Sequence, residues 1–276
     1  MDEFFRSFHF CRLSLHQHGR YARENDMRKV TLCLFIFLLL LLPLTGCTVN
    51  QNISDEERLV VENYLSRVLL QGEDAGEVFA AVKVLHRDEL SGKMEVWALV
   101  EGVAMTKEAE INQGVSLPVV LWTAKGDAGF RVTGHEVPRD GADYAQDLKT
   151  LFSRRIQGTL SSFSESRELE ILEKRIQDRI SRRQQLSMEE RQAILSAWQF
   201  VQHQPWEGKD RIDPMQVEFR ELSAMPGMEY WGQGETWRPL DGDDFGVVLG
   251  DSSSHQFAFV ILDGVTKEAL GFIPVE

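Results

Sequence analysis

Residues 93–103 read KMEVWALVEGV, and this stretch alternates as a β-strand does. Met94, Val96 and Ala98 fall on one side, because successive side chains of a strand point to opposite faces of a sheet. Three further strand-like runs surround it, and the sequence GDAG at 126–129 reads as a hairpin turn between the last two. These runs are VFAAVKVL at 78–85, VSLPVVLWTA at 115–124 and FRVTGHEV at 130–137. We expect them to form an antiparallel sheet in which Pro118 marks an edge or a bulge.

Helices are predicted on both sides of these strands in the chain. Ser54 and Glu57 form a capping box, which favours a helix running to about residue 70. A second helix is expected over 142–152. The order of helix, strands and helix predicts an α+β module over 55–157, in which a helix pair covers one face of a curved sheet. In element order this module resembles NTF2-like and cystatin-like domains.

A charged segment, 158–187, follows this first module. Its helix has a narrow apolar stripe containing Leu172, Ile176 and Ile180, so it is either a connector with a coiled-coil face or a helix packed on its own domain. A capping box at Ser187 then opens a helix to about residue 202. The strands expected after it are 217–222, 245–249, 257–262 and 269–273. Residues 188–276 are therefore predicted to form a second α+β module, and we expect the two modules to fold as separate units.

The amino-terminal region, 1–46, is predicted to be an export signal. The 13 residues 32–44 read LCLFIFLLLLLPL, which is too short for a membrane-spanning helix and suits the core of a signal peptide. Arg28 and Lys29 precede this core. The alternative is an uncleaved anchor helix.

The sequence Leu44-Thr45-Gly46-Cys47 follows the core and resembles the bacterial lipobox. That resemblance implies that the Cys47 thiol receives a diacylglycerol and that the chain is cut before Cys47. Residues 47–54 then form a lipidated tether. The implied location is the outer face of the cell membrane, or the periplasmic side if the source is Gram-negative.

Residues 1–26 add nothing that an export signal needs, and Met27 opens a signal of ordinary size. Met27 is therefore the expected true start, and a short cytoplasmic tail is the alternative.

Two further resemblances concern the region after the signal. Leu117-Pro118-Val119, with the Pro138–Gly141 turn leading to Tyr144, resembles a module of Firmicute-type lipoproteins and envelope sensors. The match covers about 55–155 and implies an extracytoplasmic module of uncharacterised function; Ser153 stands where that pattern has proline. The closing residues 257–276 resemble the tail of PepSY-like modules.

Composition limits the function further. The net charge is −13, and residues 1–46 carry six basic and four acidic residues, so the remainder is two units more negative. An acidic surface repels nucleic acid, so no nucleic-acid partner is expected, although acidity also serves solubility alone. All three cysteines lie at or before Cys47, which leaves no thiol for a disulfide or a nucleophile beyond it.

Motifs for catalysis or metal binding are not found. The acidic run Asp241–Asp244 lacks the later ligands of a calcium loop, since Phe245 and Ser252 stand at its fifth and twelfth positions. The histidines have no metal-site spacing, and Ser252–Ser254 lack the glycines of a nucleophile elbow. No catalytic residue, metal or cofactor is predicted.

Trp231 and Trp237 are the candidate binding residues, because they flank the sequence GQGET and an aromatic face can stack on a sugar or a peptide. The alternative is that both belong to the core of the second module. The function expected from the sequence is a membrane-anchored binding or regulatory module. Its partners are the membrane, through lipid on Cys47, and another envelope protein or a wall component. The alternatives are an envelope enzyme with a carboxylate site and a peptidase-inhibitor-like module.

Overall fold

The described part of the chain belongs to one compact unit. The computed structural model describes residues 53–70, 76–105, 109–127, 129–222, 225, 227–254 and 256–274. Contacts divide the chain into Met1–Thr48 and Val49–Glu276, and all described residues belong to the second unit. The predicted signal with its apolar run, Met27 and Cys47 lie outside the described residues. Among the residues that are described, no helix is both long enough and apolar enough to cross a membrane.

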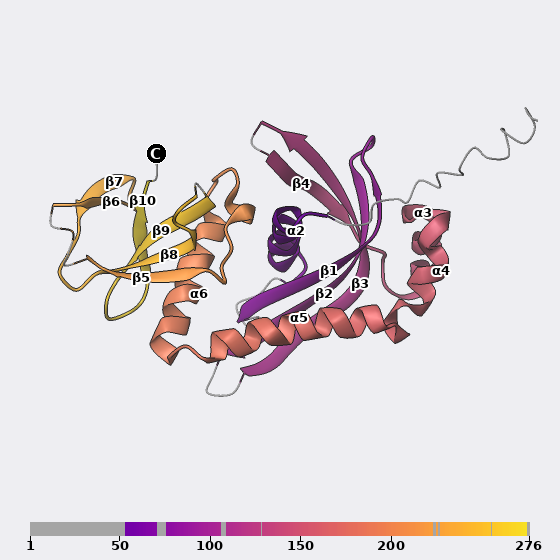
Figure 1. Cartoon of the computed structure of the whole chain (residues 1–276), viewed down its shortest axis with the longest axis horizontal. Helices are drawn as coiled ribbons and strands as arrows, with labels where there is room; N and C mark the ends of the chain where they lie inside the picture. The colour runs from indigo at the N-terminus through magenta and orange to yellow at the C-terminus, as the bar shows by residue number, and fades with distance from the viewer. Residues whose placement is uncertain are drawn as a thin grey trace, which may run out of the picture. The chain divides into compact units, whose positions relative to one another are not determined.

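The predicted α+β class is confirmed, because two antiparallel sheets with packed helices occupy the described residues (Figure 1). The elements around the first sheet are α2 (Asp55–Val68), β1 (Glu77–Asp88), β2 (Lys93–Met105), β3 (Ala109–Gly126), β4 (Gly129–Glu136), η2 (Gly141–Asp143), α3 (Tyr144–Leu151), α4 (Arg154–Ser162), η3 (Phe163–Glu165) and α5 (Arg167–Gln184). The capping box at the start of α2 forms as predicted, since Glu57 N donates to Ser54 Oγ at 3.0 Å and Ser54 N donates to Glu57 Oε2 at 3.2 Å.

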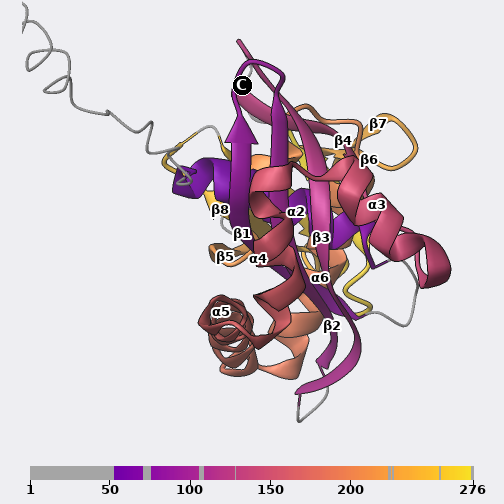
Figure 2. The ribbon, with the colours of Figure 1, turned by 90° about the vertical axis from the view of Figure 1, so that its right-hand side faces the viewer.

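The first sheet has the strand order β1-β2-β3-β4 and is buried on both faces. Met94, Val96 and Ala98 of β2 pack in one core with α2, as their alternation predicts. Trp97 and Leu99 between them are also buried, in a second core with α4 and α5. The expectation that a helix pair covers one face is therefore wrong. Helices lie on opposite faces, and Figure 2 shows α4 in front of the strands with α2 behind them.

Pro118 lies in the interior strand β3, yet at this position β3 is paired with a neighbouring strand on one side only. It pairs with Trp97 of β2 on one side. On the other side β4 ends at Glu136, opposite Val120, and does not reach Pro118. Because no β4 carbonyl stands opposite position 118, a residue without a backbone N–H costs no ladder hydrogen bond there.

The segment 158–187, predicted as a charged connector or a packed helix, contains the end of α4 and all of α5. Its apolar stripe is buried against the first sheet at Leu172, Ile176 and Ile180. Arg183 at the end of α5 is also buried. Helix α5 therefore forms part of the core of the first sheet, as the packed-helix alternative has it.

Charged side chains cover the outer edge of β1, which has no strand partner beyond it among the described residues. Val82 N donates to Glu62 Oε1 at 3.3 Å, and Arg175 Nη1 donates to Val82 O at 3.3 Å. Arg179 Nη1 donates to Ala80 O at 2.6 Å and Arg179 also pairs with Glu62. An uncovered strand edge is a template for pairing with another chain, and these side chains block it.

The second sheet has the strand order β5-β8-β9-β10-β6-β7, with helix α6 packed on one face. Its elements are α6 (Met188–His203), η4 (Lys209–Arg211), β5 (Val217–Glu221), β6 (Glu229–Gly232), β7 (Thr236–Pro239), β8 (Phe245–Asp251), β9 (Gln256–Leu262) and β10 (Ala269–Ile273). The four strands expected from the sequence are present as β5, β8, β9 and β10. Strands β6 and β7 were not expected, because each has only four residues and β7 is exposed throughout.

The loop between α6 and β5 rests on α2. Asn63 Nδ2 donates to the carbonyl oxygens of Asp210 and Ile212 at 2.8 and 2.9 Å. Arg67 pairs with the Asp210 carboxylate at 2.5 Å. A single buried asparagine thus satisfies two carbonyls of an irregular segment, which fixes this loop against the first sheet's helix.

Candidate functional site: an aromatic groove beside the second sheet

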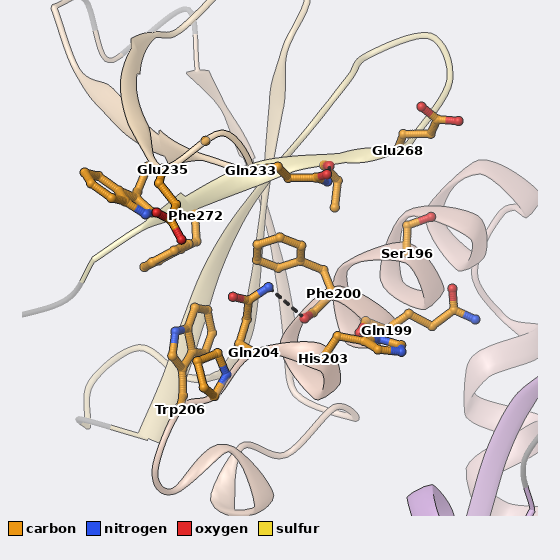
Figure 3. Close-up of a pocket in the computed structure, with 14 residues that line it drawn as sticks. Ser196, Gln199, Phe200, His203, Gln204, Trp206, Gln233, Glu235, Glu268 and Phe272 are labelled. Carbon is orange, nitrogen blue, oxygen red and sulfur yellow. Dashed lines mark hydrogen bonds between the residues drawn. The ribbon is translucent and has the colours of Figure 1, made fainter.

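An open cavity of about 830 Å³ lies between α6 and the strands β6 and β10. Its lining comes from three segments, 196–206, 231–235 and 268–272. We call it the aromatic groove (Figure 3). Its volume falls within the range of roughly 300–1,000 Å³ that is usual for small-molecule sites.

Four aromatic side chains line the groove: Phe200, Trp206, Trp231 and Phe272. The Trp206 and Phe272 ring centroids are 4.7 Å apart with the planes at 65°. Phe200 lies 6.3 Å from each of these two rings. The three rings pack edge to face or tilted, so they support one another as a platform and do not close around an enclosed space.

Local sequence explains how helix α6 contributes to this platform. Ser196, Gln199, Phe200 and His203 follow the i, i+3, i+4, i+7 spacing, so they share a face beside the buried one. The helix ends at His203 because Gln204 precedes a proline and takes an extended conformation. Trp206 follows directly, which places it below Phe200 in Figure 3.

The strand side of the groove depends on a glycine. Phe272 of β10 pairs with Trp231 of β6, so the two side chains are cross-strand neighbours on one face. A Cβ at the adjacent Gly271 would lie 2.1 Å from the Trp231 carbonyl oxygen. Only glycine therefore lets β6 approach β10 closely enough to bring Trp231 into the groove.

Amide and imidazole groups stand around the aromatic platform. Gln204 Nε2 donates to Phe200 O at 3.4 Å, and the Gln233 amide nitrogen donates to Ala269 O. His203 Nδ1 lies 2.7 Å from Gln199 O, and because a carbonyl only accepts, Nδ1 carries the proton. The amide oxygens of both glutamines and Nε2 of a neutral His203 are left as acceptors.

Glu235 stands at the lip of the groove in an unusual backbone conformation. Its φ is +54°, in the left-handed region that favours glycine. It closes the three-residue turn between the paired Gly232 and Thr236, and its N–H donates to Gly232 O at 3.0 Å. Such turns place their last residue in this conformation, where a glycine would be easier to accommodate.

The structure separates the two tryptophans that the sequence singled out. They face each other across the β6–β7 hairpin, with ring centroids 5.5 Å apart. Trp231 lines the groove, whereas Trp237 is 52% exposed and does not line it. Both lie on strands that flank the turn, and neither belongs to a buried core cluster.

Away from the aromatic groove, a polar cluster surrounds the buried carboxylate of Glu95. It accepts from Lys93 Nζ at 2.8 Å and from Ser153 N and Oγ at 2.7 and 2.8 Å. Burial raises the pKa of Glu95, but the hydrogen bonds from Lys93 and Ser153 outweigh it and lower the pKa below its ordinary value. The Ser153 hydroxyl is thus committed to a carboxylate at the start of α4, so this cluster anchors that helix to β2 and does not activate a nucleophile.

Within the described ranges no group of three or more His, Cys, Asp or Glu side chains could hold a metal ion. The Asp241–Asp244 run forms a turn in which Asp244 Oδ2 accepts from Asp241 N at 2.9 Å. Comparisons with protein-family models, with curated proteins and with solved structures gave no match.

Sequence reasoning found Trp231 and missed Phe200, Trp206 and Phe272. The α6 contribution had a signal, namely an aromatic and polar stripe beside the apolar face of a predicted helix. No local pattern in the sequence indicates that this stripe lies beside β6 and β10, which come much later in the chain.

Proposed function

We propose that this chain is a lipid-anchored, extracytoplasmic binding protein whose ligand occupies the aromatic groove. The observation that carries the proposal is the groove itself, in which exposed aromatic faces and unpaired acceptors converge. Convergent polar groups around an apolar surface are the usual form of a binding site.

Anchoring rests on the lipobox-like sequence at Cys47 and the signal-like run before it. Helix α2 begins at Asp55, so seven residues separate it from Cys47. Seven extended residues span at most about 25 Å, which would hold the folded unit close to the membrane. Tethering raises the local concentration of a ligand on the same surface, so modest affinity suffices there.

A binding role is favoured over catalysis by the two groove carboxylates. Glu235 and Glu268 are both exposed, and Figure 3 shows them on opposite rims. A carboxylate pair that cleaves a glycosidic bond needs one member kept protonated by burial, close to its partner. These two side chains do not have that environment.

Two measurements test the proposal. Mass spectrometry of the mature protein should find a diacylglycerol on Cys47 and no residues before it. The full chain in polyoxyethylene detergent should sediment with isolated cell envelopes of its source, and Trp231→Ala should weaken this capture. Trp122→Ala is the matched control, because Trp122 is 37% exposed on β3, outside the groove.

Three outcomes would overturn the proposal. The first is an intact amino terminus without lipid. The second is envelope capture that is absent or is unaffected by Trp231→Ala. The third is turnover of an envelope component that is lost in Glu235→Gln or Glu268→Gln, which would establish the enzyme alternative.

A further inference from the structure

We infer that the aromatic groove binds an uncharged glycan chain and that the Glu235 carboxylate accepts hydrogen bonds from its hydroxyl groups. This inference rests on the proposed binding function and names the chemical class of its ligand. Three properties of the groove carry it: flat aromatic faces, a rim of hydrogen-bonding groups, and the sign of the charge around them.

The aromatic platform suits sugar rings. A pyranose ring presents a flat face of C–H groups, which packs on the negative face of an aromatic ring. Phe200, Trp206 and Phe272 are mutually supported and only half-buried, so part of each ring surface stays open to a ligand. The cavity of about 830 Å³ is open and large enough for more than one sugar ring.

The rim suits hydroxyl groups, which both donate and accept. Gln204 and Gln233 use their amide nitrogens on backbone carbonyls and leave their amide oxygens as acceptors. Ser196 and Gln199 of α6 add groups that can donate as well as accept. Sugar hydroxyls can therefore hydrogen-bond along both sides of the platform.

Charge excludes anionic ligands. The lining contains the carboxylates of Glu235 and Glu268, and no lysine or arginine is among the described residues that line it. Phosphate- or carboxylate-bearing chains are bound through cationic side chains, so they would be repelled here.

A peptide cannot bind in this groove by extending the sheet. One common mode of peptide recognition adds the peptide as a strand to a free sheet edge. Strand β10, which forms the groove side, is already paired with β9 and with β6. No strand edge is therefore open beneath the aromatic platform.

The backbone of Glu235 points to its role. A left-handed conformation is strained for a residue with a Cβ, and glycine at 235 would relieve that strain. The turn itself thus gives no reason for glutamate, whereas a carboxylate on the groove lip can accept two hydroxyl hydrogen bonds from a sugar.

The test uses the full chain in polyoxyethylene detergent, because sugar-based detergents would compete. The probes are four-ring β-linked oligomers of glucose and of N-acetylglucosamine, a glucuronate-containing oligomer of equal length, and a neutral tetrapeptide. Binding is followed by calorimetry and by tryptophan fluorescence. We expect at least one neutral oligomer to bind, and the anionic oligomer and the peptide to bind at least about tenfold more weakly.

Variants then locate the ligand. Trp231→Ala should weaken glycan binding roughly tenfold, because Trp231 lines the groove beside the platform and its ring surface would be lost to the ligand. Glu235→Gly should weaken binding while raising the unfolding midpoint. The control for binding is Lys267→Gly, since Lys267 also has a positive φ, +61°, but lies outside the groove. Its unfolding midpoint is not compared, because Lys267 Nζ also packs over the Phe245 ring at 4.6 Å.

Failure of both neutral oligomers, or tighter binding of the anionic oligomer or the peptide, would overturn the glycan inference. So would a Glu235→Gly variant that binds as well as the wild type. If envelope capture nevertheless remains sensitive to Trp231→Ala, the proposed binding function stands and only the ligand class is wrong. If capture itself is absent, the proposed function fails as well.

Discussion

Replacing Arg183 with methionine should destabilise the protein strongly, because it would remove the hydrogen-bonded partner of the buried Glu77 carboxylate. The Arg183 side chain is 1% exposed at the end of α5. Its Nε donates to Glu77 Oε1 and Oε2 at 2.8 and 3.0 Å, and Nη2 lies 2.7 Å from Glu77 Oε1. Nη2 also donates to Pro214 O at 3.0 Å, which ties the loop before β5 to the same guanidinium.

The magnitude follows from burial. Removing one partner of a buried ion pair costs about 3–5 kcal/mol, whereas an exposed pair contributes about 0–1 kcal/mol. For a folded unit of this size, that loss lowers the thermal midpoint by roughly 6–20 °C. The double variant Glu77→Leu with Arg183→Met should recover most of the loss, because apolar residues of similar volume often replace a buried pair at little cost.

The pH dependence gives an independent check. Burial raises the pKa of Glu77, and Arg183, followed by Arg191, offsets part of that rise. Without Arg183 the folded-state pKa rises further above the unfolded value of about 4.3. A raised folded pKa contributes stability below the unfolded pKa that is lost as pH rises through the folded pKa. The defect of Arg183→Met should therefore be small near pH 4 and deepen toward neutral pH.

Urea unfolding of the full chain in detergent, followed by tryptophan fluorescence, measures these effects. Arg182→Met is the matched control, because Arg182 is the exposed neighbour on the same helix. A loss below about 1 kcal/mol for Arg183→Met would show that the Arg183–Glu77 pair contributes no more than a surface pair does. A double variant as unstable as the single one, or a defect independent of pH, would do the same.

Three further predictions concern other parts of the chain. Glu95→Gln should cost roughly 2–3 kcal/mol at neutral pH in a denaturant titration, because hydrogen bonds to a charged group are lost. Because the pKa of Glu95 is lowered, the wild type keeps this contribution above about pH 4.3 and loses it as pH falls through the folded pKa, so a difference that does not shrink at all as pH falls below about 4.3 would contradict this role. Trp237→Ala should change the unfolding midpoint little, because the side chain is half exposed, and a large drop would assign it to the core. A gene beginning at Met27 should give an exported and lipidated protein, and export that requires residues 1–26 would show that the earlier start is used.

The local sequence was sufficient to predict most elements of both sheets. The capping boxes at Ser54 and Ser187 mark the helix starts correctly, because a cap is a contact between residues three apart. The alternation of Met94, Val96 and Ala98 also placed them correctly on one face, because side chains two positions apart in a strand point to the same side of the sheet. Strands β6 and β7 were missed, since four mostly exposed residues carry no apolar alternation.

The candidate site could be predicted only in part. Trp231 was found because tryptophan beside a glycine-rich turn is a recognisable pattern. Its partners in the groove, Phe200, Trp206 and Phe272, come from a helix end, a linker and the last strand. Each of these alone resembles an ordinary aromatic residue of a core. Trp237, the other tryptophan that the pattern selected, does not line the groove.

Features that depend on neighbours along the chain could be predicted from the sequence alone: the caps, the strand periods, the hairpin turn at 126–129 and the resemblance of the Cys47 region to a lipobox. Only the tertiary structure decided which face each apolar stripe buries. The apolar stripe of α5 is compatible with a connector and with a core helix. Contacts with the first sheet distinguish the two, among them the hydrogen bond of Arg183 to Glu77, 106 positions earlier. In the same way, the groove exists because Gly271 lets β6 approach β10. Contacts between residues so far apart in the sequence depend on how whole elements pack, and local periodicity does not predict them.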